Sequence, residues 1–148
     1  MTVIIFVGVQ ASGKSTFYKQ HFEGEFVHVN LDSLRTRNKE RLLIEECFQN
    51  KKGFVVDNTN PTKMDRERYI GSAKEHGYRV IGYYFKSDVK SCLSRNSKRE
   101  GKKQVPNVAV LSTYNKLELP SYTEGFDELY YVQILDSEFH VENWRDEV

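Results

Sequence analysis

The sequence predicts an α/β fold built on a doubly wound, parallel sheet of about five strands with helices on both faces. Apolar runs at residues 3–7, 54–56 and 79–85 alternate with stretches that favour helices, and the connections between them are short. The first run is apolar throughout, as expected for a strand that is covered on both faces. These observations place the chain among proteins whose ligands bind at the carboxyl edge of a sheet.

The bulk composition is typical of one folded domain, and we expect residues 1–148 to form a single domain. Lysine and arginine number 22 against 21 aspartates and glutamates, so net charge indicates neither a nucleic acid nor a membrane partner. No apolar run approaches the length of a membrane span. Cys47 and Cys92 lack metal-ligand spacing, so reduced thiols and a cytoplasmic location are expected. The sequence leaves the oligomeric state open.

A phosphate-binding loop follows the first strand. The run from residue 8 to residue 15 matches G-x-x-x-x-G-K-S, and a helix is expected after it, to about residue 21. Glycines let consecutive backbone N–H groups face one anion, and the start of the helix adds partial positive charge. A strand, turn and helix with this sequence by chance is the weaker alternative. The predicted contacts to ATP phosphates are Gly8, Gln10, Ala11, Ser12, Gly13, Lys14, Ser15 and Thr16. Lys14 is expected at the β- and γ-phosphates and Ser15 on Mg²⁺.

The remaining elements alternate in type along the chain. We expect further strands at residues 25–30, 54–56, 79–85 and 129–135. We expect helices at residues 32–50, 61–77, 108–117 and from residue 87 to a break at 101–106. The acidic tail, residues 138–148, is expected to pack through Phe139 and Trp144.

Polar side chains follow the second and third strands, where a parallel sheet brings strand ends to one edge. Asp32 is a candidate general base or positioning residue for an acceptor hydroxyl, or else only a helix cap. Arg35 is a candidate phosphate ligand, or else a solvated surface arginine. Asp57 is a candidate for holding Mg²⁺ directly or through water, or a cap for the helix after Pro61.

A dense basic cluster lies at the end of the predicted helix that begins at residue 87. Such a cluster suits a lid that brings an arginine onto a transferring phosphate and excludes water. The alternative is a helix C-terminus that carries cations to match its dipole. Two arginines four residues apart favour the lid, with Arg95 and Arg99 as candidate contacts to ATP. The cluster comprises Arg95, Lys98, Arg99, Lys102 and Lys103.

The ordered set of motifs resembles the P-loop 5′-hydroxyl polynucleotide kinases, especially the kinase domain of the animal polynucleotide kinase/phosphatase and the phage enzyme. The resemblance spans residues 3–134 and rests on residues 8–16, 26–32, 57–61, 95–99, 105–106, 119–120 and 124–126. It implies strand order 2-3-1-4-5 and the use of ATP and Mg²⁺. It also implies that Asp32 is the general base on the acceptor 5′-hydroxyl, that Arg35 holds the acceptor's 3′-phosphate, and that Arg99 contacts the ATP phosphates.

One departure from the family concerns Leu31, which stands where family members usually carry an arginine. Near-zero net charge also favours a single-stranded end or a small acceptor over tight duplex binding. The leading prediction is ATP-dependent phosphorylation of 5′-hydroxyl ends of DNA or RNA, in nucleic acid repair. The alternatives are a kinase of a nucleoside or sugar on the same scaffold, and a non-catalytic, ATP-dependent binding module.

Overall fold

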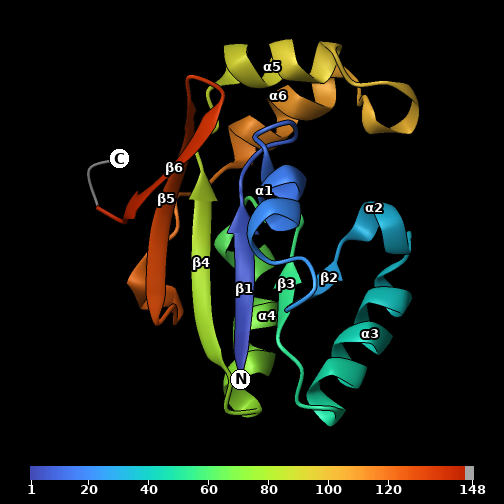
Figure 1. Ribbon diagram of the computed structural model, residues 1–148, viewed down its shortest axis with the longest axis vertical. Coiled ribbons are helices and arrows are strands. Elements are labelled where there is room, and N and C mark those ends of the chain that lie inside the picture. Colours follow the sequence, from blue (N-terminus) through green and yellow to red (C-terminus); the bar gives the residue numbers. More distant parts are fainter. Residues whose placement is uncertain (146–148) are drawn as a thin grey trace.

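A six-stranded sheet forms the centre of the protein, in the order β2-β3-β1-β4-β5-β6 (Figure 1). The computed structural model describes residues 1–145, apart from the side chain of Lys102. All pairs are parallel except β5 with β6. The α/β fold and the strand order 2-3-1-4-5 are therefore confirmed, with one strand added. The strands are β1 Thr2–Val7, β2 Val27–Val29, β3 Phe54–Val56, β4 Arg79–Phe85, β5 Glu128–Leu135 and β6 Glu138–Asn143.

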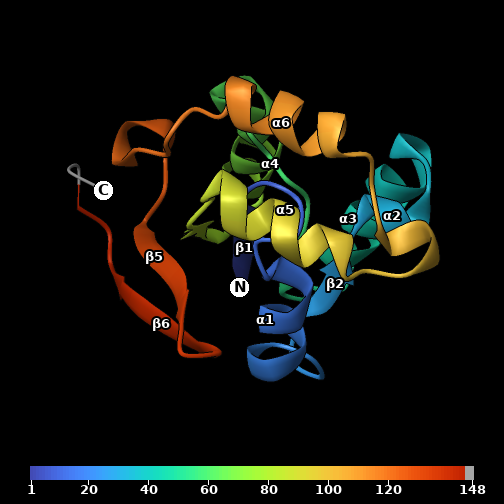
Figure 2. The same cartoon turned by 90° about the horizontal axis from the view of Figure 1, so that it is seen from above.

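The helices cover both faces of the sheet and its carboxyl edge. They are α1 Lys14–His21, α2 Leu31–Leu34, α3 Arg37–Gln49, α4 Lys63–Glu75, α5 Val89–Ser97 and α6 Asn107–Lys116, with 3₁₀ turns η1 Gly101–Lys103 and η2 Tyr122–Glu124. One apolar core joins α3 and α4 to the sheet, and another joins α1 to the opposite face. Figures 1 and 2 show α5 and α6 across the strand tips. Within residues 1–145, no helix has the length and apolarity that crossing a membrane requires.

The predicted helix over residues 32–50 is wrong, because two helices occupy this stretch. The first, α2, ends at Arg35, whose φ of 75° breaks the helical path. Thr36 then begins α3, and its hydroxyl accepts a hydrogen bond from the Lys39 N–H (3.1 Å). Arg35 therefore separates the short α2 from α3.

The helix predicted from Pro61 begins later, at Lys63. Thr62 and Asp65 cap its first turn reciprocally, so that Pro61 lies outside the helix. Because Thr62 is the cap, the alternative in which Asp57 caps this helix is also wrong. The Asp57 carboxylate is left for other partners.

The tail contributes a strand that the sequence did not reveal. Asp136 and Ser137 both adopt positive φ (52° and 64°), which turns β5 tightly into β6. Phe139 on β6 packs edge-on against Phe17, and Trp144 is buried beside Tyr84 on the other face. The predicted packing of Phe139 and Trp144 is confirmed, whereas residues 146–148 of the predicted tail lie outside the described residues.

Candidate functional site

The loop between β1 and α1 is anchored by the two neighbouring strand ends. The Gly8 N–H donates to the Thr59 carbonyl (3.0 Å), and the Val9 N–H donates to the Ser87 hydroxyl (3.0 Å). Gly13 adopts φ of 100°, and a Cβ there would lie 2.9 Å from the Phe139 ring. The loop therefore needs glycine at this position on two independent grounds. The added strand β6 closes one side of the loop.

Lys14 lies buried inside the curve of this loop. Its Nζ donates to the carbonyls of Gly8 (3.0 Å) and Val9 (2.8 Å). Burial lowers the pKa of Lys14 to about 8; Asp57 and Asp32 oppose this shift, and Arg99 adds to it. Asp32 and Arg99 are therefore close enough to Lys14 to influence the pKa of its amine. A buried cation surrounded by neutral carbonyls is suited to an anionic ligand.

Ser15 and Asp57 form the second part of the site. The Ser15 hydroxyl donates to Asp57 Oδ2 (2.7 Å), and His28 Nε2 lies 2.7 Å from the same oxygen. The Asp57 side chain is 1% exposed, and its carbonyl accepts from Asn30 Nδ2 (2.6 Å). A hydroxyl and a carboxylate in contact are oxygen ligands of the kind that Mg²⁺ prefers.

No group of three or more acidic, histidine or cysteine ligands gathers in residues 1–145. A cation at Ser15 and Asp57 would therefore share its coordination with phosphate oxygens and water.

The contact between His28 and Asp57 was not predicted. His28 contacts Asp57 because β2 pairs with β3 in a register that sets His28 beside Val55. Its ring also stacks on Tyr18, with centroids 4.0 Å apart. Strand register is a tertiary property, so the sequence around His28 gave no sign of this contact.

Arg66, which is fully buried, supports the turn after β3. Arg66 donates to both carboxylate oxygens of Glu124 (2.8 and 3.1 Å) and to the Asn60 carbonyl (2.9 Å). Asn60 in turn donates to the Phe6 carbonyl on β1 (2.8 Å). The sequence missed Arg66, since an arginine on a polar helix carries no sign of burial. Its ion pair joins α4, η2 and the polar turn into one support for the site.

Replacing Arg66 by methionine is expected to destabilise the fold by about 3–5 kcal/mol. The variant keeps side-chain volume but leaves Glu124, whose side chain is 8% exposed, without its partner. Urea unfolding measures the change. Arg79→Ala is the control, because the Arg79–Glu128 pair is largely exposed and should contribute less than about 1 kcal/mol. Equal effects of the two variants would contradict this role of Arg66.

Asp32 lies on α2 and is exposed. Asn30 caps this helix, since its Oδ1 accepts from the Ser33 N–H (3.1 Å), so the alternative in which Asp32 is the cap is wrong. The Leu31 N–H donates to Asn58 Oδ1 (3.0 Å), which ties α2 to the turn that carries Asp57. Arg35 is exposed at the end of α2 in a conformation that non-glycine residues seldom adopt. The Asp32 carboxylate is thus held at the site by its helix.

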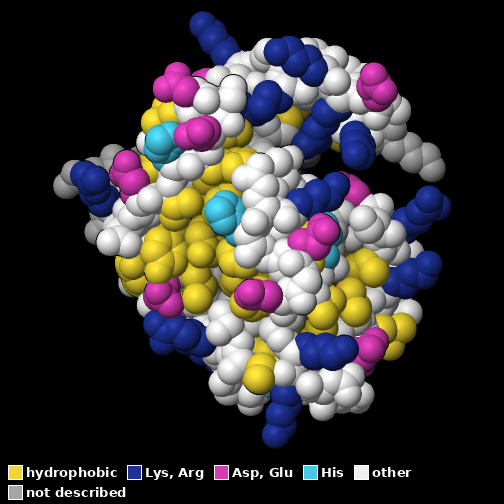
Figure 3. Space-filling model, viewed as in Figure 1, with side chains coloured by type: hydrophobic (Ala, Val, Ile, Leu, Met, Phe, Trp, Pro, Cys, Tyr) yellow, Lys and Arg dark blue, Asp and Glu magenta, His cyan; other side chains and the backbone are white. Residues whose placement is uncertain are grey.

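The helices above the strand tips also reach the loop. Arg95 Nε on α5 donates to the Ala11 carbonyl (2.6 Å), and Gln10 Nε2 donates to Thr113 Oγ1 on α6 (3.1 Å). Arg99, just beyond α5, donates to the Lys103 carbonyl (3.2 Å). Figure 3 shows a hollow between this segment and α2. Of the remaining predicted residues, Ser12 is buried within the loop and Thr16 is exposed on α1.

The sheet order, the glycine loop and the buried lysine define a P-loop protein with the kinase form of that fold. A family model described as an AAA domain matches residues 3–120. The chain belongs to this AAA domain family.

Two curated relatives are similar in sequence to most of this chain. The chain is 30% identical to a bifunctional polynucleotide phosphatase/kinase of Schizosaccharomyces pombe, over 84% of this chain and 31% of the relative. It is 28% identical to an L-seryl-tRNA(Sec) kinase of Methanococcus maripaludis, over 84% of this chain and 56% of the relative. The chain thus spans about a third to about half of these proteins. The resemblance to polynucleotide kinases is confirmed at this level.

Among solved structures, a gluconokinase from Sinorhizobium meliloti 1021 has a similar fold. The TM-score is 0.62 at 18% identity, over 89% of this chain and 82% of the other. At this identity the likeness concerns the fold alone.

Proposed function

We propose that this chain is an ATP- and Mg²⁺-dependent kinase that phosphorylates the 5′-hydroxyl end of a DNA or RNA strand, with residues 1–148 acting as one kinase domain. The observation that carries the proposal is the position of Asp32. Its carboxylate is exposed and caps no helix, yet it lies close enough to Lys14 to raise the pKa of that amine. A phosphoryl transferase needs such a group opposite the bound phosphates.

The ATP phosphates are assigned to the loop from Gly8 to Thr16. Lys14 donates to the β- and γ-phosphates by exchanging its bonds to the Gly8 and Val9 carbonyls for phosphate oxygens. Arg95 and Arg99 supply further positive charge from the α5 side. Ser15 and Asp57 fit Mg²⁺, which when bound neutralises charge that develops on the phosphates.

In the transfer step, Asp32 is the proton acceptor. The acceptor 5′-oxygen forms a bond to the γ-phosphorus while the bond from that phosphorus to the bridging oxygen breaks, and ADP leaves. The proton of the 5′-hydroxyl passes to the Asp32 carboxylate. Arg99 stabilises the negative charge of the transferring group, and Arg35 binds a phosphate of the acceptor on the outer side of α2.

The acceptor class rests on the relatives. A relative named for polynucleotide phosphorylation matches over most of this chain. A small-molecule kinase remains the alternative, because the same fold serves sugar kinases such as the gluconokinase. A binding module without catalysis has no use for Asp32 and Arg99 beside Lys14.

Acceptor competition tests the proposal. The specificity constant, kcat/KM, is measured for 5′-hydroxyl DNA and RNA oligonucleotides, for their 5′-phosphorylated twins, and for gluconate and free nucleosides. We expect transfer to a 5′-hydroxyl oligonucleotide to exceed transfer to any small molecule by at least about a hundredfold, with none to the twins. Faster transfer to a nucleoside or sugar would contradict the proposal.

The lowered pKa of Lys14 predicts proton uptake on ATP binding. With a pKa of about 8, the amine is half charged at pH 8, and the triphosphate then favours its charged form. ATP binding should therefore take up roughly half a proton at pH 8 and about a tenth of a proton at pH 7. Calorimetry in buffers of different ionisation enthalpy measures this number. Equal uptake at both pH values would contradict the assignment of Lys14 to the phosphates.

A further inference from the structure

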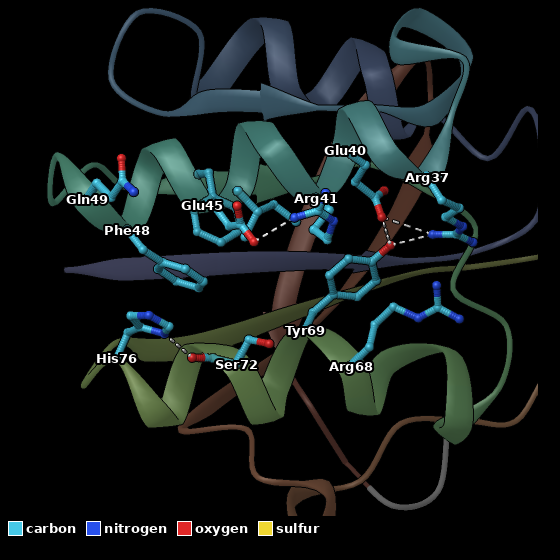
Figure 4. Close-up of a pocket in the computed structure, with 12 residues that line it drawn as sticks. Arg37, Glu40, Arg41, Glu45, Phe48, Gln49, Arg68, Tyr69, Ser72 and His76 are labelled. Carbon is cyan, nitrogen blue, oxygen red and sulfur yellow. Dashed lines mark hydrogen bonds and ion pairs between the residues drawn. The ribbon is translucent and has the colours of Figure 1, made fainter.

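A groove of about 680 Å³ runs between α3 and α4, on the face of the sheet opposite α1. Figure 4 shows Arg37 and Arg68 at one end of the groove and Phe48 with His76 at the other. Phe54 of β3 contributes to the apolar lining. Helix α3 has 13 residues, so the groove follows about 20 Å of helix. None of these side chains has a role in the phosphate site or in the transfer step.

Hydrogen bonds link the arginine end of this groove to the site. Buried Glu40, on the groove wall, accepts from Asn58 Nδ2 (3.0 Å). The other atom of the same amide, Asn58 Oδ1, accepts from the N–H of Leu31, the residue before Asp32. Two hydrogen bonds through one side chain thus connect the groove to the helix of Asp32. The groove wall and the helix of Asp32 are therefore neighbours, as a strand that contacts both requires.

The residues that line the groove include positive charge that no carboxylate of the groove pairs. Its two carboxylates are already partnered: Glu40 by Arg37 (3.1 Å) and Tyr69 (2.9 Å), and Glu45 by Arg41 (2.9 Å). Arg68 is exposed and forms no ion pair or side-chain hydrogen bond with any residue that the structure describes.

Arg37 also keeps capacity for a ligand. It uses only Nη1 for its contacts to Glu40 and the Tyr69 hydroxyl, and its side chain is 53% exposed. The Arg68 side chain and Arg37 Nη2, which form no side-chain hydrogen bond within residues 1–145, lie at one end of the groove and are suited to phosphate groups.

The other end of the groove presents an aromatic surface. The rings of Phe48 and His76 are stacked, with centroids 3.8 Å apart and planes 5° from parallel. His76 is exposed, so part of its ring is accessible to a further planar group. Cationic side chains followed by aromatic faces are the arrangement with which proteins bind single strands, because phosphates pair with the first and bases stack on the second.

We propose that the α3–α4 groove binds the single-stranded segment that follows the phosphorylated 5′ end. Arg37 and Arg68 bind its phosphates, and a base stacks on His76. This inference rests on the proposed function and adds to it a preference for longer, single-stranded acceptors. It gives a local basic surface to a chain whose net charge is near zero.

Fluorescence anisotropy tests this groove directly. The probe is a 5′-hydroxyl DNA single strand of about ten nucleotides labelled at its 3′ end, with a dinucleotide as competitor. We expect Arg68→Ala to weaken binding of the long strand about fivefold and to reduce the salt slope of binding by about 0.7, with no change for the dinucleotide. Lys19→Ala is the control, because Lys19 is exposed on α1 across the sheet. A structural effect of Arg68 would leave the salt slope unchanged.

The possible outcomes separate the groove from the proposed function. Equal binding by Arg68→Ala and Lys19→Ala, or equal affinity of the parent for long strand and dinucleotide, overturns the groove. Phosphoryl transfer to the dinucleotide is measured on the same preparations. Transfer without length dependence retains the kinase and overturns the groove. Length-dependent binding through Arg68 without any transfer retains the groove and contradicts the kinase.

Discussion

Replacing Asp32 by alanine is expected to lower kcat for phosphoryl transfer by a factor of about 10²–10⁴, the usual contribution of a general base. The variant lacks the group that accepts the proton of the acceptor hydroxyl. The dissociation constant for ATP should change little, because the loop, Arg95 and the pair of Ser15 with Asp57 are untouched. Steady-state transfer and ATP titration measure the two quantities separately.

The control for Asp32 is stability. Its side chain is exposed and the cap of α2 belongs to Asn30, so the melting temperature of Asp32→Ala should equal that of the parent within about a degree. A lowered melting temperature together with lost ATP binding would mean that Asp32 supports the fold and not the transfer. Unchanged kcat would remove the proposed base.

Replacing Lys14 by methionine is expected to lower kcat/KM for ATP by a factor of about 10²–10³. The variant keeps much of the side-chain volume but loses the amine that donates to the Gly8 and Val9 carbonyls inside the curve of the loop. The melting temperature without nucleotide should not fall, because burial makes the charged amine unfavourable in the free protein, as its lowered pKa indicates.

The pH dependence of stability checks the second half of this prediction. The pKa of Lys14 is about 8 in the folded chain and near 10.5 when unfolded, so the unfolded chain holds more protons between these values. Parent stability therefore gains from this group as pH rises through that window, and the variant lacks the gain. Equally tight binding of ATP by Lys14→Met and by the parent would contradict the assignment of Lys14 to the ATP phosphates.

Much of the fold could be predicted because its signals are local. The apolar run before Gly8, the glycine loop and Lys14 specify a strand, an anion cradle and a helix within a few residues of each other. Asp32 follows β2 and Asp57 follows β3, and β3 lies between β2 and β1, so topology alone brought both carboxylates to one edge. Ser15 and Asp57, each predicted as a Mg²⁺ ligand, are brought into contact by the same topology.

The features that the sequence did not predict depend on backbone conformations and contacts that only the folded chain sets. The break between α2 and α3 depends on Arg35 at positive φ, which helix propensity does not predict. The strand β6 depends on a turn of Asp136 and Ser137, without the glycine that usually marks it. The buried pair of Arg66 with Glu124 joins residues 58 positions apart, so only the folded chain brings them together.

The measurement that tests the central claim most directly is the location of the transferred phosphate in a single turnover. The parent and Asp32→Ala are each loaded with γ-labelled ATP and Mg²⁺ and mixed with a 5′-hydroxyl oligonucleotide, and the product is digested to nucleotides. The account predicts label on the 5′ oxygen of the terminal nucleotide from the parent, and at least about a hundredfold slower labelling from the variant. Bound ATP with no label on the oligonucleotide, or equal rates from both proteins, would contradict it.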